Sequence, residues 1–139
     1  MKSIDKEKLL REATLAKVHS YSPYSKFRVG AAVLMKNSEV ISGANVENAS
    51  YPCCICAERN VLSTAYGKGY NKNDIVALAL CSDTKEHIYP CGMCCQVICE
   101  LMNADCPIFL INSKNEIKET KVRKLLPNCF TLDGDKKNV

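Results

Sequence analysis

Apolar and polar positions follow one another along the chain in blocks that predict helices and strands. In residues 5–20 the apolar side chains recur at helical spacing behind Asp5, which predicts an amphipathic helix capped by that carboxylate. Residues 27–35 and 39–45 are rich in strand-forming side chains and are joined by the polar turn Lys-Asn-Ser. The first third of the chain therefore predicts a helix followed by a β-hairpin.

The rest of the chain alternates predicted helices with apolar strands. Residues 74–82 form a nearly continuous apolar run, which predicts a strand buried on both faces. The other expected elements are helices at 56–67, 91–105 and 122–127 and strands at 106–112 and 115–120. The order α-β-β-α-β-α-β-β-α predicts the α/β class: a three-layer α/β/α sandwich with a mixed five-stranded sheet, formed by one domain over residues 1–139.

Composition narrows the choice of partners. The net charge of +4 is spread over several segments, and the chain has no tryptophan and three phenylalanines, so it lacks the basic, aromatic surface of a nucleic-acid binder. The first residues are charged and are followed by no long apolar run, so we expect neither a signal peptide nor a membrane span. These features predict a cytoplasmic protein without a nucleic-acid or membrane partner.

Ten cysteines are many for such a chain. Because a reducing compartment keeps thiols free, clustered cysteines are expected to bind metal or take part in chemistry rather than to cross-link. Outside the clusters discussed next, we expect only core or incidental roles for Cys53, Cys54, Cys81, Cys99, Cys106 and Cys129.

Cys91 and Cys94 lie three positions apart at the start of a predicted helix, on one face of it. Alone, this pair fits a redox dithiol or half of a structural zinc site as well as a catalytic metal site. Cys56, at the start of another helix that follows a strand, is the nearest plausible third ligand. Three protein ligands leave one zinc position open, which is typical of catalytic zinc.

Two charged residues follow Cys56 within one helical turn. Glu58 is placed to take a proton from a metal-bound water and to pass it on. Three thiolates would leave Zn²⁺ with a net negative charge, and Arg59 can offset it by donating hydrogen bonds to the sulfurs. We therefore predict Cys56, Cys91 and Cys94 as ligands of one zinc ion per subunit, Glu58 as the catalytic residue, and Arg59 beside the ligands.

Four stretches together resemble the zinc-dependent cytidine deaminases: Cys-Ala-Glu, Pro-Cys-x-x-Cys, YSKFRVGAAV and GANVENASY. The resemblance, to the short homotetrameric form of the family, runs from about Tyr21 to Phe130. It implies hydrolytic deamination of cytidine and 2′-deoxycytidine to uridine and 2′-deoxyuridine, with release of ammonia, in pyrimidine salvage. In that chemistry zinc-bound hydroxide attacks C4 and Glu58 shuttles protons.

The resemblance also assigns a substrate site. It implies that Phe27 stacks on the pyrimidine and that Asn45 and Glu47 bind the sugar hydroxyls. It implies a homotetramer with shared active sites, in which a neighbouring subunit contributes part of the pocket. The remaining residues that it assigns to substrate binding are Ala49, Tyr51 and Phe130.

One position departs from the family pattern, which usually reads Pro-Cys-Gly-x-Cys-Arg-Gln. Cys95 stands where the arginine is expected, whereas Gln96 is retained and is predicted to lie near the metal site. Adjacent helical residues point about 100° apart, so Cys95 is a poor fourth ligand beside Cys94.

Three other functions share parts of this pattern. A deaminase of the blasticidin type shares Cys-Ala-Glu and Pro-Cys-Gly-x-Cys, although Asn-Val-Glu-Asn-Ala-Ser-Tyr argues against it. A deaminase acting on RNA or DNA would need a more basic rim. A structural zinc domain would use neither the open position nor Glu58.

Overall fold

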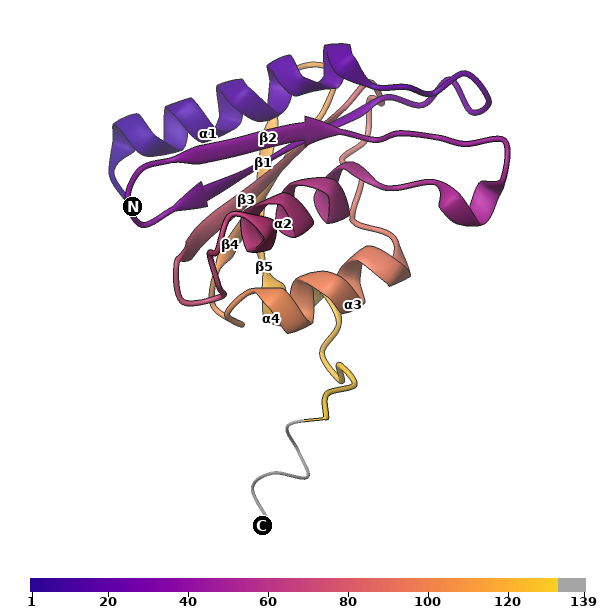
Figure 1. Cartoon of the computed structure of the whole chain (residues 1–139). Coiled ribbons are helices and arrows are strands. Elements are labelled where there is room, and N and C mark those ends of the chain that lie inside the picture. Colours follow the sequence, from indigo (N-terminus) through magenta and orange to yellow (C-terminus); the bar gives the residue numbers. More distant parts are fainter. Residues whose placement is uncertain (133–139) are drawn as a thin grey trace.

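A five-stranded sheet with helices on both faces forms the body of the molecule in a computed structural model, which describes residues 1–132 (Figure 1). The strands lie in the order β2-β1-β3-β4-β5. The main elements are α1 (Ser3–Ala16), β1 (Val29–Met35), β2 (Val40–Ala44), α2 (Ala57–Gly67), β3 (Ile75–Ser82), α3 (Gly92–Leu101), β4 (Pro107–Ile111), β5 (Ile117–Lys121) and α4 (Val122–Leu125). Two short 3-10 turns, η1 (Lys17–His19) and η2 (Tyr51–Cys53), complete them.

The sheet is mixed, as predicted. β1 is antiparallel to both β2 and β3, β3 is parallel to β4, and β4 is antiparallel to β5. A parallel pair needs a crossover connection, and α3 supplies it between β3 and β4. The predicted α/β class and order of elements are therefore confirmed. In the described part of the chain, the helices are all too short or too polar to cross a membrane.

Alternating side chains of the central strands pack into two apolar clusters, one on each face of the sheet. Val33 of β1 belongs to the cluster under α2 and α3, whereas the next residue, Leu34, belongs to the cluster under α1. This alternation follows from the period of two in a strand and explains why β1 and β3 read as continuous apolar runs. Gly30 allows α1 to lie close to β1, because a Cβ there would be 2.2 Å from the Ala13 carbonyl oxygen.

The amino-terminal cap of α1 differs from the prediction. The helix begins at Ser3, with Lys2 at the cap position, so Asp5 lies inside the first turn. Its carboxylate accepts a hydrogen bond from the Ser38 hydroxyl in the turn between β1 and β2. The prediction of an Asp5 cap was wrong because helical spacing alone does not show how far a helix extends before its first apolar residue.

The topology brings the starts of two helices to one edge of the sheet. β2 and β3 are both antiparallel to β1, so they run in the same direction and their carboxyl ends share an edge. α2 follows β2 in the chain and α3 follows β3, so both helices begin at that edge (Figure 1). Residues carried by the first turns of α2 and α3 therefore meet.

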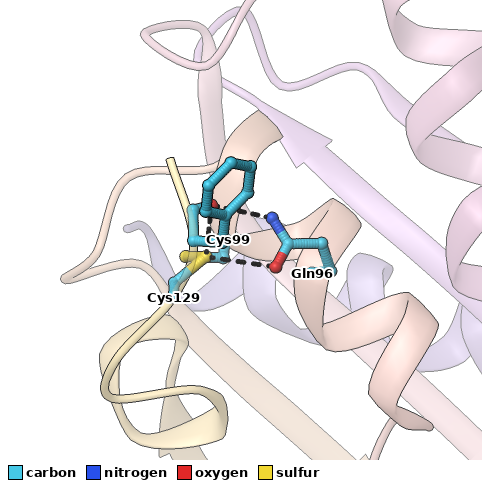
Figure 2. The surroundings of a disulfide bond; sticks show 4 residues. Gln96, Cys99 and Cys129 are labelled. Atoms are coloured by element: carbon cyan, nitrogen blue, oxygen red, sulfur yellow. Dashed lines mark hydrogen bonds between the residues drawn. A yellow bond between two sulfur atoms is a disulfide. The ribbon is translucent and has the colours of Figure 1, made fainter. Parts of the chain in front are cut away.

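A disulfide bond ties the carboxyl-terminal segment to α3. Cys99 of α3 is bonded to Cys129, with their Cα atoms 6.6 Å apart, and Gln96 lies one turn earlier on the same helix (Figure 2). The expectation of incidental roles is therefore wrong for Cys99 and Cys129, which are cross-linked in this structure although a reducing compartment would favour their free thiols. The pairing depends on α4 turning the chain back along α3, which no local pattern of cysteines reveals.

We expect Cys129→Ser to lower the free energy of unfolding by about 3 kcal/mol, because the disulfide closes a long loop in the unfolded chain. The two cysteines are 30 residues apart in the sequence. Guanidinium unfolding at one fixed protein concentration measures this change. Cys53→Ser, which alters an exposed free thiol, is the matched control and should have little effect. Alkylation of all ten cysteines in the denatured, unreduced protein would contradict the disulfide.

Candidate active site

Three cysteine sulfurs converge where α2 and α3 begin. Cys56 is the cap residue of α2, Cys91 is the cap residue of α3, and Cys94 lies in the first turn of α3. Their sulfur atoms all lie within 4.8 Å of one another, and those of Cys56 and Cys91 are 4.0 Å apart. The structure thus brings together the three residues that were predicted as ligands.

The geometry of this cluster fits a tetrahedral metal ion. With Zn–S bonds of about 2.3 Å, sulfurs at the corners of a tetrahedron lie about 3.8 Å apart. The observed 4.0 Å separation is close to that value, and zinc prefers thiolate ligands. Three sulfurs fill three corners, so the fourth stays available for water or substrate.

The cluster lies in a positive electrostatic environment. Each helix directs its amino-terminal end, which carries a partial positive charge, toward the sulfurs, and the Cys94 amide donates to the Cys91 sulfur at 3.4 Å. Nη2 of Arg59 lies 3.9 Å from the Cys56 sulfur and also donates to the Cys54 carbonyl at 3.1 Å. The guanidinium is therefore held where it offsets thiolate charge.

Proton sharing among the thiols prepares the site for a cation. A hydrogen bond from Cys94, aided by Arg59 and Cys91, lowers the pKa of Cys56 to about 5 and outweighs the opposing effect of burial. The same hydrogen bond, together with burial, raises the pKa of Cys94. A divalent metal replaces such shared protons when it binds.

Glu58 is the buried carboxyl beside the thiols. Only 5% of its surface is exposed, and this burial raises the pKa of its carboxyl to about 7. Glu58 lines a cavity of about 160 Å³ together with two of the ligands, Cys56 and Cys91. The cavity also has Phe27 and Asn45 in its wall.

Known proteins are similar to this chain. Residues 3–110 match the family model of the cytidine and deoxycytidylate deaminase zinc-binding region. The chain belongs to this family. It is 48% identical over 130 residues to a cytidine deaminase of Halalkalibacterium halodurans, a match that covers 94% of this chain and 97% of the relative. A cytidine deaminase of Sporosarcina psychrophila is 43% identical, with 94% of each chain covered.

A solved structure supports the fold as well. The crystal structure of cytidine deaminase from Burkholderia pseudomallei superposes with a TM-score of 0.87 and 38% identity, covering 94% of this chain and all of the other (100%). The protein is accordingly a zinc-dependent hydrolytic deaminase, and its three-thiol cluster is consistent with one zinc ion.

Four residues that line the cavity of this deaminase escaped the analysis of its sequence: Val29, Ala57, Ile88 and Tyr89. Ile88 and Tyr89 lie in the segment that joins β3 to α3. Both directly precede the Pro-Cys of the motif, and that position is the signal that could have identified them.

Asn45, one of the two residues predicted to bind the sugar, is held by three hydrogen bonds in the deaminase. Oδ1 of Asn45 accepts hydrogen bonds from the Val29 amide at 2.9 Å and from the Ser20 hydroxyl, and its Nδ2 donates to the Phe27 carbonyl at 2.8 Å. Within residues 1–132, the second N–H of that amide has no acceptor. Glu47 lines a second, wider pocket of about 290 Å³, to which Tyr51 also contributes.

Three other predicted residues do not line the Glu58 cavity in the described part of the chain. Phe130 is 69% exposed, and the Gln96 amide donates to its carbonyl at 2.9 Å. The oxygen of the same amide faces Cys129, so among the described residues the contacts of Gln96 are with the carboxyl-terminal segment and not with a thiol ligand. Ala49 is exposed in the loop that precedes η2.

Cys95, the departure from the family pattern, is buried on another side of α3. Its thiol donates to the Pro90 carbonyl at 3.3 Å. Burial raises the pKa of this thiol. Among the described residues, the group that could hold a metal consists of the other three cysteines and excludes Cys95.

Proposed function

We propose that this enzyme deaminates cytidine and 2′-deoxycytidine to uridine and 2′-deoxyuridine, with release of ammonia, in pyrimidine salvage in the cytoplasm. The observation that carries the proposal is the buried Glu58 carboxyl beside three thiols, in a cavity that has Phe27 in its wall. The relatives named cytidine deaminase support the choice of substrate. The whole chain would act as one domain, residues 1–139.

Cys56, Cys91 and Cys94 would hold the zinc ion of each subunit. When bound, zinc supplies the Lewis acidity that makes water a nucleophile at neutral pH. The protein residues then have three tasks: to place the pyrimidine, to hold the sugar, and to move protons.

Glu58 would carry out the proton transfers. A carboxyl with a pKa of about 7 can both accept and donate a proton at neutral pH, which is the property that a shuttle needs. Glu58 accepts the proton of the attacking water and delivers it to N3 of the pyrimidine. It would then take the proton of the hydroxyl now bonded to C4 and pass it to the amine as the C4–N bond breaks, so that water and cytidine give uridine and ammonia.

Phe27 and two polar residues would orient the nucleoside. The Phe27 ring lies in the wall of the Glu58 cavity, where it can stack on the pyrimidine. The free N–H of Asn45 and the Glu47 carboxylate are suited to the sugar hydroxyls, since hydrogen bonds to a charged group are the stronger ones.

We further propose a homotetramer with shared active sites. The cavity of one chain, about 160 Å³, is smaller than the roughly 300–1,000 Å³ of pockets that enclose small molecules. Large side chains that could complete a neighbour's site are exposed, with Tyr51 and Phe130 each 69% accessible. Ala49 lies in the same exposed loop as Tyr51, and Phe130 is fixed by the disulfide and by Gln96.

We expect Glu58→Gln to lower kcat for cytidine by about 10²–10⁴-fold, because the amide cannot accept the proton of the attacking water. Ultraviolet absorbance follows the deamination, and elemental analysis should still find about one zinc per chain, as expected for a residue that is not a ligand. Glu100→Gln, on the exposed side of α3, is the control and should retain full activity. If the zinc-loaded wild type leaves cytidine and 2′-deoxycytidine unchanged, the proposed substrate assignment is wrong.

Sedimentation equilibrium should give four times the chain mass of 15.4 kDa. Phe130→Ala is expected to raise KM for cytidine, because the ring would no longer reach the neighbouring site. A stable monomer with full activity would overturn the shared site while leaving the proposed reaction intact.

A further inference from the structure

Ser25, a residue without a role in the proposed reaction so far, joins the Glu47 carboxylate to the loop that carries Phe27. The Ser25 hydroxyl donates to Oε1 of Glu47, and the backbone amides of Tyr24 and Ser25 donate to Oε2, each at 3.1 Å. Three donors from two consecutive residues therefore fix the carboxylate. The Ser25 hydroxyl is also the main cause of the lowered pKa of Glu47, so the carboxylate stays ionised.

The same hydroxyl oxygen accepts a hydrogen bond from the Phe27 amide at 3.0 Å. A hydroxyl has one proton to donate and lone pairs to accept, so Ser25 can serve Glu47 and Phe27 at once. Between them, Lys26 has a φ of 58°, in the left-handed region that non-glycine residues rarely occupy. The turn thus adopts a conformation that needs such contacts to hold it.

The opposite side of this turn is fixed as well. The Phe27 carbonyl accepts from Asn45, and the Glu47 amide donates to the Tyr21 carbonyl at 2.8 Å. Residues 20–28 and 45–47 are therefore joined along their length. Ser25 is the point at which the pocket of Glu47 and Tyr51 is bonded directly to the aromatic wall of the Glu58 cavity.

We propose that Ser25 is a positioning residue that sets the preference for a hydroxylated sugar, by holding the Glu47 carboxylate at a fixed place relative to the Phe27 ring. This inference rests on the proposed deamination of nucleosides. Ser25 itself does not touch the reacting atoms. It fixes the orientation of the Glu47 carboxylate, so that the remaining lone pairs can accept a hydrogen bond from a sugar hydroxyl when the pyrimidine lies against Phe27.

The test compares the substrates cytidine, 2′-deoxycytidine and 2′,3′-dideoxycytidine, the last of which lacks the 2′ and 3′ hydroxyls and keeps only the 5′ hydroxyl. In Ser25→Ala, the ratio of kcat/KM for cytidine to that for dideoxycytidine should fall by about tenfold, the size expected for one hydrogen bond to a charged group. The change should appear mainly in KM. Ser25→Thr keeps the hydroxyl and should keep the ratio.

Glu47→Gln provides the reference. It should lower the same ratio, and the double variant Ser25→Ala/Glu47→Gln should lower it no further than Glu47→Gln alone, because the serine acts through that carboxylate. A general loosening of the loop would instead reduce kcat/KM for all three substrates in proportion, and that result would overturn the proposal.

The possible failures are distinguishable. If the zinc-loaded wild type deaminates no nucleoside, the proposed function fails and this inference fails with it. If Glu47→Gln lowers the ratio but Ser25→Ala does not, the role of Ser25 alone is wrong. Ser25 is exposed, so Ser25→Ala is expected to fold; should it not, Ser25→Gly removes the same hydroxyl and carries the same test.

Discussion

Mutual repulsion of three thiolates is the constraint on which the rest of this structure depends. Sulfurs within 4.8 Å of one another cannot all ionise unless positive charge is close by. The fold supplies it from two helix amino-termini and from Arg59, and a divalent cation supplies the remainder. The cluster thus requires that α2 and α3 begin at the same edge of the sheet, which the shared direction of β2 and β3 ensures.

The Phe27 loop and Glu58 lie at the same edge of the sheet. Val46 forms isolated bridges with Tyr21 on one side and with Ile55 on the other, so the loop after β2 holds the Phe27 loop near the start of α2. Glu58 follows Cys56 by two positions and is buried by this arrangement. Cys56, Cys91, Glu58 and Phe27 therefore line one cavity, where backbone hydrogen bonds join the chain segments that carry them.

Local sequence patterns predicted the elements and the pairing of Cys91 with Cys94 because each depends on short-range chemistry. The apolar run of β3 and the spacing of Cys91 and Cys94 carry their meaning within a few residues. The Cys99–Cys129 disulfide depends on where α4 directs the chain, so no local sequence pattern could predict this pairing. The backbone contacts of Asn45 were likewise out of reach, since they join segments far apart in the sequence.

X-ray absorption at the zinc edge would test the central claim most directly, because it counts the atoms bound to the metal. The account predicts three sulfurs at about 2.3 Å and one oxygen at about 2.0 Å, the pattern of a catalytic site with an open position. Four sulfurs at about 2.3 Å would mean a closed structural site. In that case Glu58 would have no water to act on, and the catalytic interpretation of the cluster would fail.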